Sequence, residues 1–251
     1  MIDLKNDGDV AIVTIQHGKA NALDIELCEG LTKCFDGLRR SDARAVVLTG
    51  QGRMFSAGVD LIRVSSGGAD YVRAFLPSLH RLYDAVFFHP QPVVAAINGH
   101  AIAGGCVLAC CADRRIMADA SGRIGVTELL VGVPFPALAF EIVRFAVPAR
   151  YLTEFTFGAA TYDTDAALQR GWVDAVVPAE TVMTSAMAAA RQMAQLSPAA
   201  FGQAKKQIRQ HVGDSVARSG AETDKIVTDI WAAPESLGYI RAYVARTLKK
   251  A

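Results

Sequence analysis

Two short loops of small residues follow stretches that are rich in β-branched residues. They read "FSAGVD" at residues 55–60 and "AIAGGC" at residues 101–106. Glycine allows backbone conformations and close approaches that a side chain forbids. Where such a loop opens a helix, free N–H groups and the helix dipole favour a negatively charged oxygen. Either loop alone could be a tight core turn, but two of them after successive strands favour an oxyanion site.

A carboxylate, Glu128, opens the segment "ELLVG". Its neighbours Val126, Leu129 and Leu130 are apolar, and we expect them to raise its pKa toward the value that suits a general base. The alternative is a helix-terminus residue stabilised by the helix dipole. Glu141 is a second candidate acid, which we expect to be mainly solvated.

The overall charge argues against a polyanionic partner. Lys and Arg number 26 against 25 Asp and Glu, which gives a net charge of +1. General attraction to nucleic acid or to an anionic membrane is therefore not expected. The first ten residues are too acidic and polar for a signal or transit peptide, so we expect a cytoplasmic protein.

The five cysteines are odd in number and show no CxxC spacing. This pattern predicts free, mostly buried thiols in a reducing compartment. The alternative is a metal site or a thiol nucleophile that combines Cys106 and Cys110 with a distant histidine. Because buried free cysteine is common, we expect packing thiols and no metal.

Residues 92–112 carry no formal charge and are long enough to span a bilayer. The segment "NGH" at residues 98–100 signals a turn, and the glycine pair at residues 104–105 interrupts the run again. The part before the turn is rich in β-branched residues, and the part after it is too short to span alone. We therefore predict a buried strand, a turn and a buried helix.

Hydrophobic patterning predicts strands that alternate with helices over most of the chain. Expected strands cover residues 10–16, 43–50, 92–97 and 114–119, and expected helices cover residues 22–40, 69–88 and 105–113. Residues 51–70 combine glycines with small polar residues and are expected to form a functional or flexible loop. From about residue 179 the pattern is almost wholly helical, with apolar stripes that need a covering surface such as another subunit. The sequence therefore predicts an α/β fold with sites in the loops after strands.

Taken together, these segments resemble the crotonase superfamily of enoyl-CoA hydratases and isomerases. The order and spacing of six motifs carry the resemblance: "KANALD" at 19–24, "VVLTGQGRMFSAGVDL" at 46–61, "PVVAAINGHAIAGGCVLA" at 92–109, "TELLVG" at 127–132, "GWVDAVVP" at 171–178, and the helical tail. The resemblance implies a crotonase-type spiral of ββα units with a C-terminal helical trimerisation region. It divides the chain into a spiral core at residues 1–190 and a C-terminal helical region at residues 191–251. It also implies an acyl-CoA substrate and a homotrimer or hexamer.

The same resemblance assigns the chemistry to particular positions. The two oxyanion-hole donors fall on the main-chain N–H groups of Val59 and Gly104, and a side chain at Gly104 would crowd the thioester carbonyl. Hydratases of this family use two glutamates, of which the second falls on Glu128. The first falls on Val107, which cannot transfer a proton. A single carboxylate suits a proton shuttle from C2 to C4 of a 3-enoyl-CoA, so the pattern resembles the family's Δ3,Δ2-enoyl-CoA isomerases.

The resemblance also implies where the substrate binds. Nine positions are expected to contact it: Lys19, Ala20, Ala22, Arg53, Ala57, Asp60, Leu61, Gly105 and Val107. Lys19 and the backbone after it fall near the adenine and pantetheine, Arg53 falls near phosphate, and Asp60 with Leu61 lies beside the adenine pocket. No separate cofactor is implied, because coenzyme A is part of the substrate.

Other positions have less definite roles under this resemblance. Tyr243 with Lys249 or Lys250 falls on a C-terminal helix that reaches the CoA, although exposed terminal lysines often serve only solubility. His100 lies beside the second glycine loop, and we expect it to line the pocket or to pack.

The segment "VGVPFPALAFE" departs from the hydratase pattern, since Phe135 and Pro136 replace a glycine-rich stretch. This change is expected to reshape the acyl pocket. Two alternatives to the isomerase remain open. One is another crotonase-type reaction, such as weak hydration or thioester hydrolysis, in which Glu128 works with a water or with Glu141. The other is a non-catalytic acyl-CoA binding protein.

Overall fold

The computed structural model describes residues 1–247 of the chain. Lys249 and Lys250, which the resemblance places near the CoA, lie outside the described residues. No helix within the described part is long and apolar enough to cross a membrane. The expected cytoplasmic location stays a prediction.

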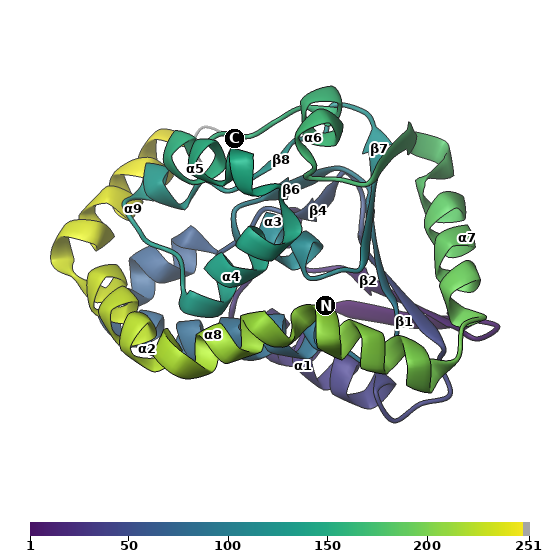
Figure 1. Ribbon diagram of the computed structural model, residues 1–251. Coiled ribbons are helices and arrows are strands. Elements are labelled where there is room, and N and C mark those ends of the chain that lie inside the picture. The colour runs from purple at the N-terminus through teal and green to yellow at the C-terminus, as the bar shows by residue number, and fades with distance from the viewer. Residues whose placement is uncertain (248–251) are drawn as a thin grey trace.

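A six-stranded sheet forms the centre of the molecule (Figure 1). Its strands, in spatial order, are β1 (Ile2–Asp7), β2 (Val10–Ile15), β3 (Ala45–Gly50), β5 (Val93–Ile97), β7 (Arg114–Asp119) and β9 (Ala175–Pro178). Only the β1–β2 pair is antiparallel; the other pairs are parallel. Every residue of β3 and β5 is buried, as expected for a parallel sheet covered on both faces.

A second, smaller sheet contains three short parallel strands, β4 (Met54–Ser56), β6 (His100–Ile102) and β8 (Ile124–Gly125). Each of them follows a strand of the larger sheet along the chain, so β3–β4, β5–β6 and β7–β8 form three successive units that alternate between the two sheets. This repeated arrangement confirms the predicted crotonase-type spiral.

Helices cover the sheets on both sides (Figure 1). They are α1 (Ile25–Leu38), α2 (Leu61–Phe87), α3 (Gly104–Cys110), the 3-10 helix η1 (Glu128–Val131), α4 (Ala137–Ala146), α5 (Ala149–Gly158), α6 (Thr164–Arg170), the 3-10 helix η2 (Ala179–Thr181), α7 (Val182–Ala194), α8 (Pro198–Ala232) and α9 (Pro234–Thr247). Helix α7 packs on one face of the larger sheet through Ala186 and Ala190, which cluster with Val47 and Val94. The larger core, with α1, α2, α3 and α4, lies on the other face.

The structure differs from the predicted elements in three places. The loop expected at residues 51–70 contains β4 and the beginning of α2, because Asp60 caps that helix through hydrogen bonds from the amides of Ile62 and Arg63. The predicted helix start at residue 69 coincides instead with a break inside α2, where Gly68 has φ 61° and ψ −149°. Strands β1, β6 and β9 were not predicted as separate strands.

The predicted division of the chain after residue 190 falls inside α7. That helix packs against the larger sheet, whereas α8 and α9 pack on the helices of the other face. The division into a core and a C-terminal region stays a prediction.

A buried ionic cluster fastens α8 to the core. Asp113, at the beginning of the β7 segment, accepts hydrogen bonds from Lys205 Nζ at 2.6 Å and from Arg209 Nη2 at 2.8 Å. The side chains of Lys205 and Arg209 are only 6% and 3% exposed. Arg209 also donates to the carbonyl of Cys111 at 3.1 Å. Two buried cations therefore depend on one carboxylate.

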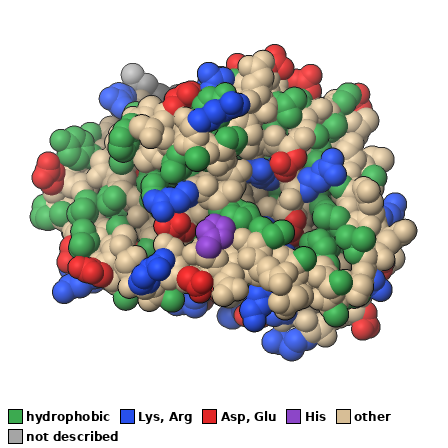
Figure 2. Space-filling view, in the orientation of Figure 1, with side chains coloured by type: hydrophobic (Ala, Val, Ile, Leu, Met, Phe, Trp, Pro, Cys, Tyr) green, Lys and Arg blue, Asp and Glu red, His purple; other side chains and the backbone are tan. Residues whose placement is uncertain are grey.

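The surface carries charges of both signs. On the face shown in Figure 2, acidic and basic side chains are interspersed among apolar and uncharged ones. This distribution agrees with the net charge of +1.

The buried ionic cluster predicts how much stability the protein loses when the Asp113 carboxylate is removed. Asp113→Asn leaves Lys205 and Arg209 without a counter-charge, and such a loss typically costs about 3–5 kcal/mol. We expect the free energy of unfolding in urea, measured at fixed protein concentration, to fall by this amount. Asp70→Asn is the control, because Asp70 is fully exposed in its pair with Arg73 and the change should leave the midpoint nearly unaltered. Equal midpoints for the two variants would contradict the proposed anchoring.

Candidate active site

Three loops with candidate chemistry begin at the same edge of the smaller sheet. Val59 follows the end of β4 by three residues, Gly104 follows the end of β6 by two, and Glu128 follows the end of β8 by three. The strands are parallel, with Ser56 beside Ala101 and Ala101 beside Ile124, and the β4–β6 register shifts by one residue between Met54 and Ser56. Since carboxyl ends of parallel strands meet at one edge, the sheet brings the two predicted amide donors and the predicted base together.

The Val59 amide is directed by its pairing with Leu23. The Leu23 amide donates to Gly58 O at 2.8 Å, and the Asp60 amide donates to Leu23 O at 2.9 Å. In a parallel pair, the residue between two such bonds directs its own N–H to the opposite side. Among the hydrogen bonds of residues 1–247, the Val59 amide has no acceptor. It is therefore free to bind an oxygen.

The two glycine loops pack backbone against backbone. Gly58 has φ 81°, and a Cβ at this position would come within 2.6 Å of Ile102 O and 2.9 Å of Gly104 N. This close approach sets the Val59 amide beside the Gly104 amide. Similarly, a Cβ on Gly105 would lie 2.3 Å from Ser56 O. Glycine is required at these places by the contact between the loops.

Gly104 is the first residue of α3, where amides have no acceptor within the helix. In the described part of the chain its N–H has no other acceptor either. Ala103 before it has φ 50° and ψ −124°, which is rare for a residue with a side chain. A Cβ on Gly104 would meet the Tyr83 hydroxyl at 2.9 Å and Leu23 Cδ1 at 3.2 Å. Contact with Tyr83 is thus a reason for glycine at this position, and the expected crowding of the substrate carbonyl stays a prediction.

Glu128 is a buried carboxylate with an unsatisfied oxygen. The residue is 8% exposed, and within residues 1–247 its Oε2 has no hydrogen-bond partner. Burial raises its pKa to about 7, against the opposing effect of the backbone N–H groups of Glu128 and Thr127. A group that titrates near neutral pH can both accept and return a proton.

The surroundings of Glu128 differ in part from the prediction. Val126 is buried, but Leu129 and Leu130 are 42% and 56% exposed. They follow Glu128 in the four-residue helix η1, whose three residues per turn direct them to other sides. The raised pKa agrees with the expectation, whereas the exposure of Leu129 and Leu130 shows that these two leucines are not part of the buried core.

Val107 lies in the first turn of α3 and is 1% exposed. The helix contains no acidic residue. Position 107 therefore contributes apolar packing, where the resemblance places the first glutamate of hydratases. Glu141, the other candidate acid, is not solvated as expected: its side chain is 14% exposed and pairs with Arg144 at 3.1 Å and Ser215 Oγ at 3.2 Å.

The segment predicted to hold CoA lies along the first glycine loop. The Ala57 amide donates to Ala20 O at 3.0 Å, so Ala20 and its neighbour Lys19 lie beside the loop. Lys19 is exposed, and Ala22 is half-buried. Asp60 and Leu61 lie in the same region, although the Asp60 carboxylate is already engaged as the cap of α2.

Arg53 and His100 lie at the other end of the smaller sheet. Arg53 precedes β4, and its Nη2 donates to Ser121 Oγ at 2.5 Å. His100 begins β6 beside Met54, and its pKa is lowered by burial and by the charges of Arg53 and Arg123. The structure therefore does not bring these two residues together with Val59, Gly104 and Glu128.

Sequence patterns did not reveal Asn21, which holds in place the segment that is predicted to bind CoA. Asn21 is 1% exposed with φ 46°, donates from Nδ2 to Met54 O at 2.8 Å and accepts from the His17 amide at 2.9 Å. Ser56 Oγ donates to its carbonyl at 2.8 Å. The available signal was an asparagine among alanines, because asparagine tolerates positive φ and hydrogen-bonds to nearby backbone.

The other candidate residues lie in the core or are free thiols. Tyr243 is half-buried on α9 and packs against the larger core, within which Phe135 is 8% exposed. All five cysteines are free, and Cys106 and Cys110 are buried. No group of three or more His, Cys, Asp or Glu that could hold a metal ion is found within residues 1–247.

The geometry brings two amides without acceptors near a buried carboxylate, an arrangement able to stabilise an oxyanion beside a group that can transfer protons. Residues 5–237 match the sequence profile of the enoyl-CoA hydratase/isomerase family. The chain is 34% identical over 196 residues to a putative enoyl-CoA hydratase of Thermus thermophilus, which covers 76% of this chain and 77% of that protein. The protein belongs to the enoyl-CoA hydratase/isomerase family, whose members act on acyl-CoA substrates.

Solved structures of similar proteins support the same fold. An enoyl-CoA isomerase of Mycobacterium tuberculosis superposes with a TM-score of 0.82 at 30% identity, over 90% of this chain and 97% of that one. Human mitochondrial Δ3-Δ2-enoyl-CoA isomerase superposes with a TM-score of 0.94 at 24% identity, over 99% and 98% of the two chains. The latter identity is low enough that it shows the fold alone.

The pKa of Glu128 predicts a pH profile. A carboxylate that is the expected base must be ionised to accept a proton, so turnover of a CoA thioester should rise about tenfold per pH unit at low pH and level off above about pH 7. Glu128→Gln should lower kcat by about 10²–10⁴-fold and leave Kd for the CoA ester nearly unchanged. Activity that survives this change would show that Glu128 is not the base.

The burial of Glu128 also predicts that replacing this carboxylate stabilises the fold. The unfolded carboxyl ionises near pH 4.5 and the folded one near 7, so ionised Glu128 reduces stability increasingly between these values and fully above them. Glu128→Gln should therefore raise the free energy of unfolding at pH 8 by roughly 3 kcal/mol. The gain should disappear below about pH 4.5. Urea titrations of both proteins at pH 4 and pH 8 measure it.

Proposed function

We propose that the protein isomerises 3-enoyl-CoA to trans-2-enoyl-CoA, with Glu128 as the single acid and base. The observation that carries this proposal is the combination of a buried Glu128, whose pKa is raised to about 7, with the apolar Val107 at the other glutamate position. Hydration needs one group that activates water for addition at C3 and another group that delivers a proton to C2. One carboxylate suffices to move a proton between two carbons of the same substrate.

In the proposed reaction, Glu128 removes a proton from one carbon of the substrate and returns it to another. The Glu128 carboxylate removes a proton from C2 of the 3-enoyl thioester, and the electron pair is delocalised over the diene and the thioester oxygen. The amides of Val59 and Gly104 donate hydrogen bonds to this oxygen. The carboxyl of Glu128 then returns the proton to C4, which leaves the double bond between C2 and C3. No atom is gained or lost.

Two unsatisfied amides make this route energetically reasonable. Removing one oxyanion-hole donor typically costs about 2.7–4 kcal/mol in the transition state. Both donors are fixed main-chain groups, so they need no reorganisation when the charge develops. The names of relatives do not decide between the reactions: the Thermus thermophilus protein is called a putative hydratase, and the structurally similar Mycobacterium tuberculosis protein is called an isomerase in one solved structure and a probable enoyl-CoA hydratase in another. The residue at position 107 is our reason for preferring the isomerase.

The proposal extends to the CoA and to assembly. Lys19, Ala20, Ala22, Ala57, Asp60 and Leu61 would contact the CoA, while Gly105 and Val107 would line the acyl end. We further propose a trimer, or a hexamer of two trimers. Apolar residues of α8 support a subunit interface, since Ile208, Ile226 and Ile230 are 60%, 54% and 40% exposed.

A substrate comparison tests the reaction. Purified protein should convert 3-enoyl-CoA to 2-enoyl-CoA and should hydrate trans-2-enoyl-CoA at least a hundredfold more slowly, as followed by chromatography of the CoA esters. Rapid hydration would overturn the isomerase assignment in favour of a hydratase. Tight binding without turnover of either ester would instead favour an acyl-CoA binding protein.

Restoring the missing carboxylate is a more demanding test. Val107→Glu should introduce measurable hydration of trans-2-enoyl-CoA, because it supplies the second proton-transfer group of a hydratase. Val107→Gln is the matched control of similar size and no acid-base function. Equal hydration by the two variants would show that position 107 does not face the substrate.

A further inference from the structure

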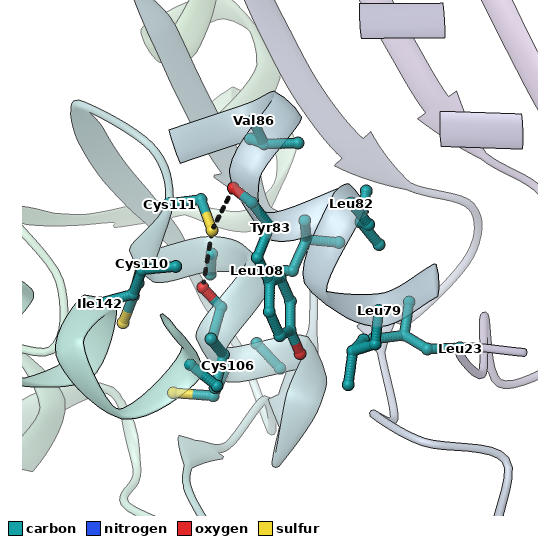
Figure 3. Packing of buried hydrophobic residues seen from close by; sticks show 14 of the residues in the cluster. Leu23, Leu79, Leu82, Tyr83, Val86, Cys106, Leu108, Cys110, Cys111 and Ile142 are labelled. Atoms are coloured by element: carbon teal, nitrogen blue, oxygen red, sulfur yellow. Dashed lines mark hydrogen bonds between the residues drawn. The ribbon is translucent and has the colours of Figure 1, made fainter. Parts of the chain in front are cut away.

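A buried tyrosine on α2 contacts the turn that carries one of the oxyanion donors. The Tyr83 hydroxyl donates a hydrogen bond to Gly104 O at 2.9 Å. The side chain is almost completely buried, with the residue 1% exposed. Figure 3 shows the ring extending from α2, with its hydroxyl at the end remote from Cys111.

Tyr83 touches α3 at both ends. Its hydroxyl binds the carbonyl of Gly104, the first residue of the helix, while its own carbonyl lies 4.0 Å from the sulfur of Cys111, just after the helix. The Cys111 sulfur also lies 3.3 Å from Val107 O. Leu79, Leu82 and Val86 are buried on the same segment of α2 (Figure 3). The tyrosine therefore spans the short helix whose first amide is the proposed donor.

Gly104 belongs to two peptide planes, and both are held by hydrogen bonds. Its N–H belongs to the peptide plane shared with Ala103, and that plane is held by Ala103 O, which accepts from Cys106 N at 2.8 Å and Val107 N at 3.1 Å. Its carbonyl belongs to the next plane, where Tyr83 provides a hydrogen bond. The hydroxyl lies 2.9 Å from the position that a Cβ of Gly104 would occupy. The tyrosine thus fills the place of the absent side chain.

We propose that Tyr83 is a positioning residue of the oxyanion turn, which holds Gly104 so that its amide faces the thioester oxygen. This inference rests on the proposed function of that amide. It also explains why residue 104 is glycine, since the tyrosine hydroxyl occupies the space beside its Cα. Tyr83 is not the proton donor itself, because its hydrogen is engaged by Gly104 O. Burial raises the pKa of the phenol, so it stays protonated.

A pair of tyrosine variants separates positioning from simple packing. Tyr83→Phe removes only the hydroxyl and should lower kcat about five- to tenfold, the scale of one neutral hydrogen bond. KM should stay within twofold, and the pH midpoint set by Glu128 should not move. Tyr162→Phe is the control, because the Tyr162 hydroxyl binds the exposed side chain of Glu154 at 3.2 Å. A Tyr83→Phe enzyme that loses stability but keeps its kcat would overturn the proposal.

A double-variant cycle tests whether a side chain at residue 104 and the Tyr83 hydroxyl compete for the same space. Gly104→Ala should lower kcat at least a hundredfold, because the new methyl collides with the hydroxyl. Adding Tyr83→Phe makes room, so the double variant should be at least fivefold more active than Gly104→Ala alone. Losses that multiply independently would show that the two residues do not act through this contact.

Two further measurements test the Tyr83 contact even if the proposed isomerase function is wrong. If wild type does not isomerise 3-enoyl-CoA, exchange of the α-protons of butyryl-CoA in D2O still reports on the oxyanion amides, and the same variants are compared by that rate. If wild type supports neither reaction, the Gly104 amide is observed by NMR after labelling glycine with 15N. A Tyr83→Phe shift confined to Gly104 and its neighbours would support the positioning contact, and an unchanged resonance would overturn it.

Discussion

The site depends on the parallel pairing of β4, β6 and β8. These strands have only two or three residues each, and the groups that could do chemistry follow directly after them. A register slip of one residue would move a loop by about 3.3 Å, whereas catalytic geometry tolerates displacements of about 1 Å. The short sheet therefore requires further contacts to hold its register.

Backbone hydrogen bonds around the sheet provide that constraint. The Ala101 amide donates to Arg123 O at 2.9 Å, and the Ala103 amide donates to Gly125 O at 2.8 Å. On the other side, Asn21 and Leu23 bind the β4 segment. The two glycine loops are thus held by neighbouring main chain and by the Asn21 side chain, which explains how such short strands can place groups accurately.

The C-terminal helices hold the segment that follows Glu128. Trp231 Nε1 on α8 donates to Pro134 O at 2.8 Å, and Asp224 on the same helix accepts from the Ala137 amide at 2.7 Å. The ring of Tyr239 on α9 lies 3.0 Å from the place where a Cβ of Gly132 would be. Burying an ionisable carboxylate lowers stability, and these contacts offset that cost in the same segment. The helical tail therefore belongs to the site's support, whatever its role between subunits.

Sequence patterns predicted the groups that lie in loops better than the contacts that fix them. The two glycine loops and Glu128 could be identified because small residues and an isolated acid interrupt apolar segments. Tyr83 and Asn21 could not, since their roles depend on Gly104 and Met54, which are far away in the chain. Strands β1 and β9 are partly exposed edge strands, so their residues lack the continuous apolar pattern of β3 and β5. Arg53 illustrates the opposite error: it adjoins the glycine loop in sequence, but the strand between them separates it from Val59.

The glycines of the two loops determine geometry, and they do so for reasons of packing. Gly58 must accommodate Ile102 O, and Gly104 must accommodate the Tyr83 hydroxyl. Any chain with these contacts presents the same pair of amides, whichever reaction it performs. In the proposed reaction the outcome depends on side chains that the fold leaves variable, here Glu128 and Val107, because a carboxylate can transfer a proton and a valine cannot. Membership of the family therefore predicts oxyanion stabilisation. The buried Val107 is the observation that favours isomerisation over hydration.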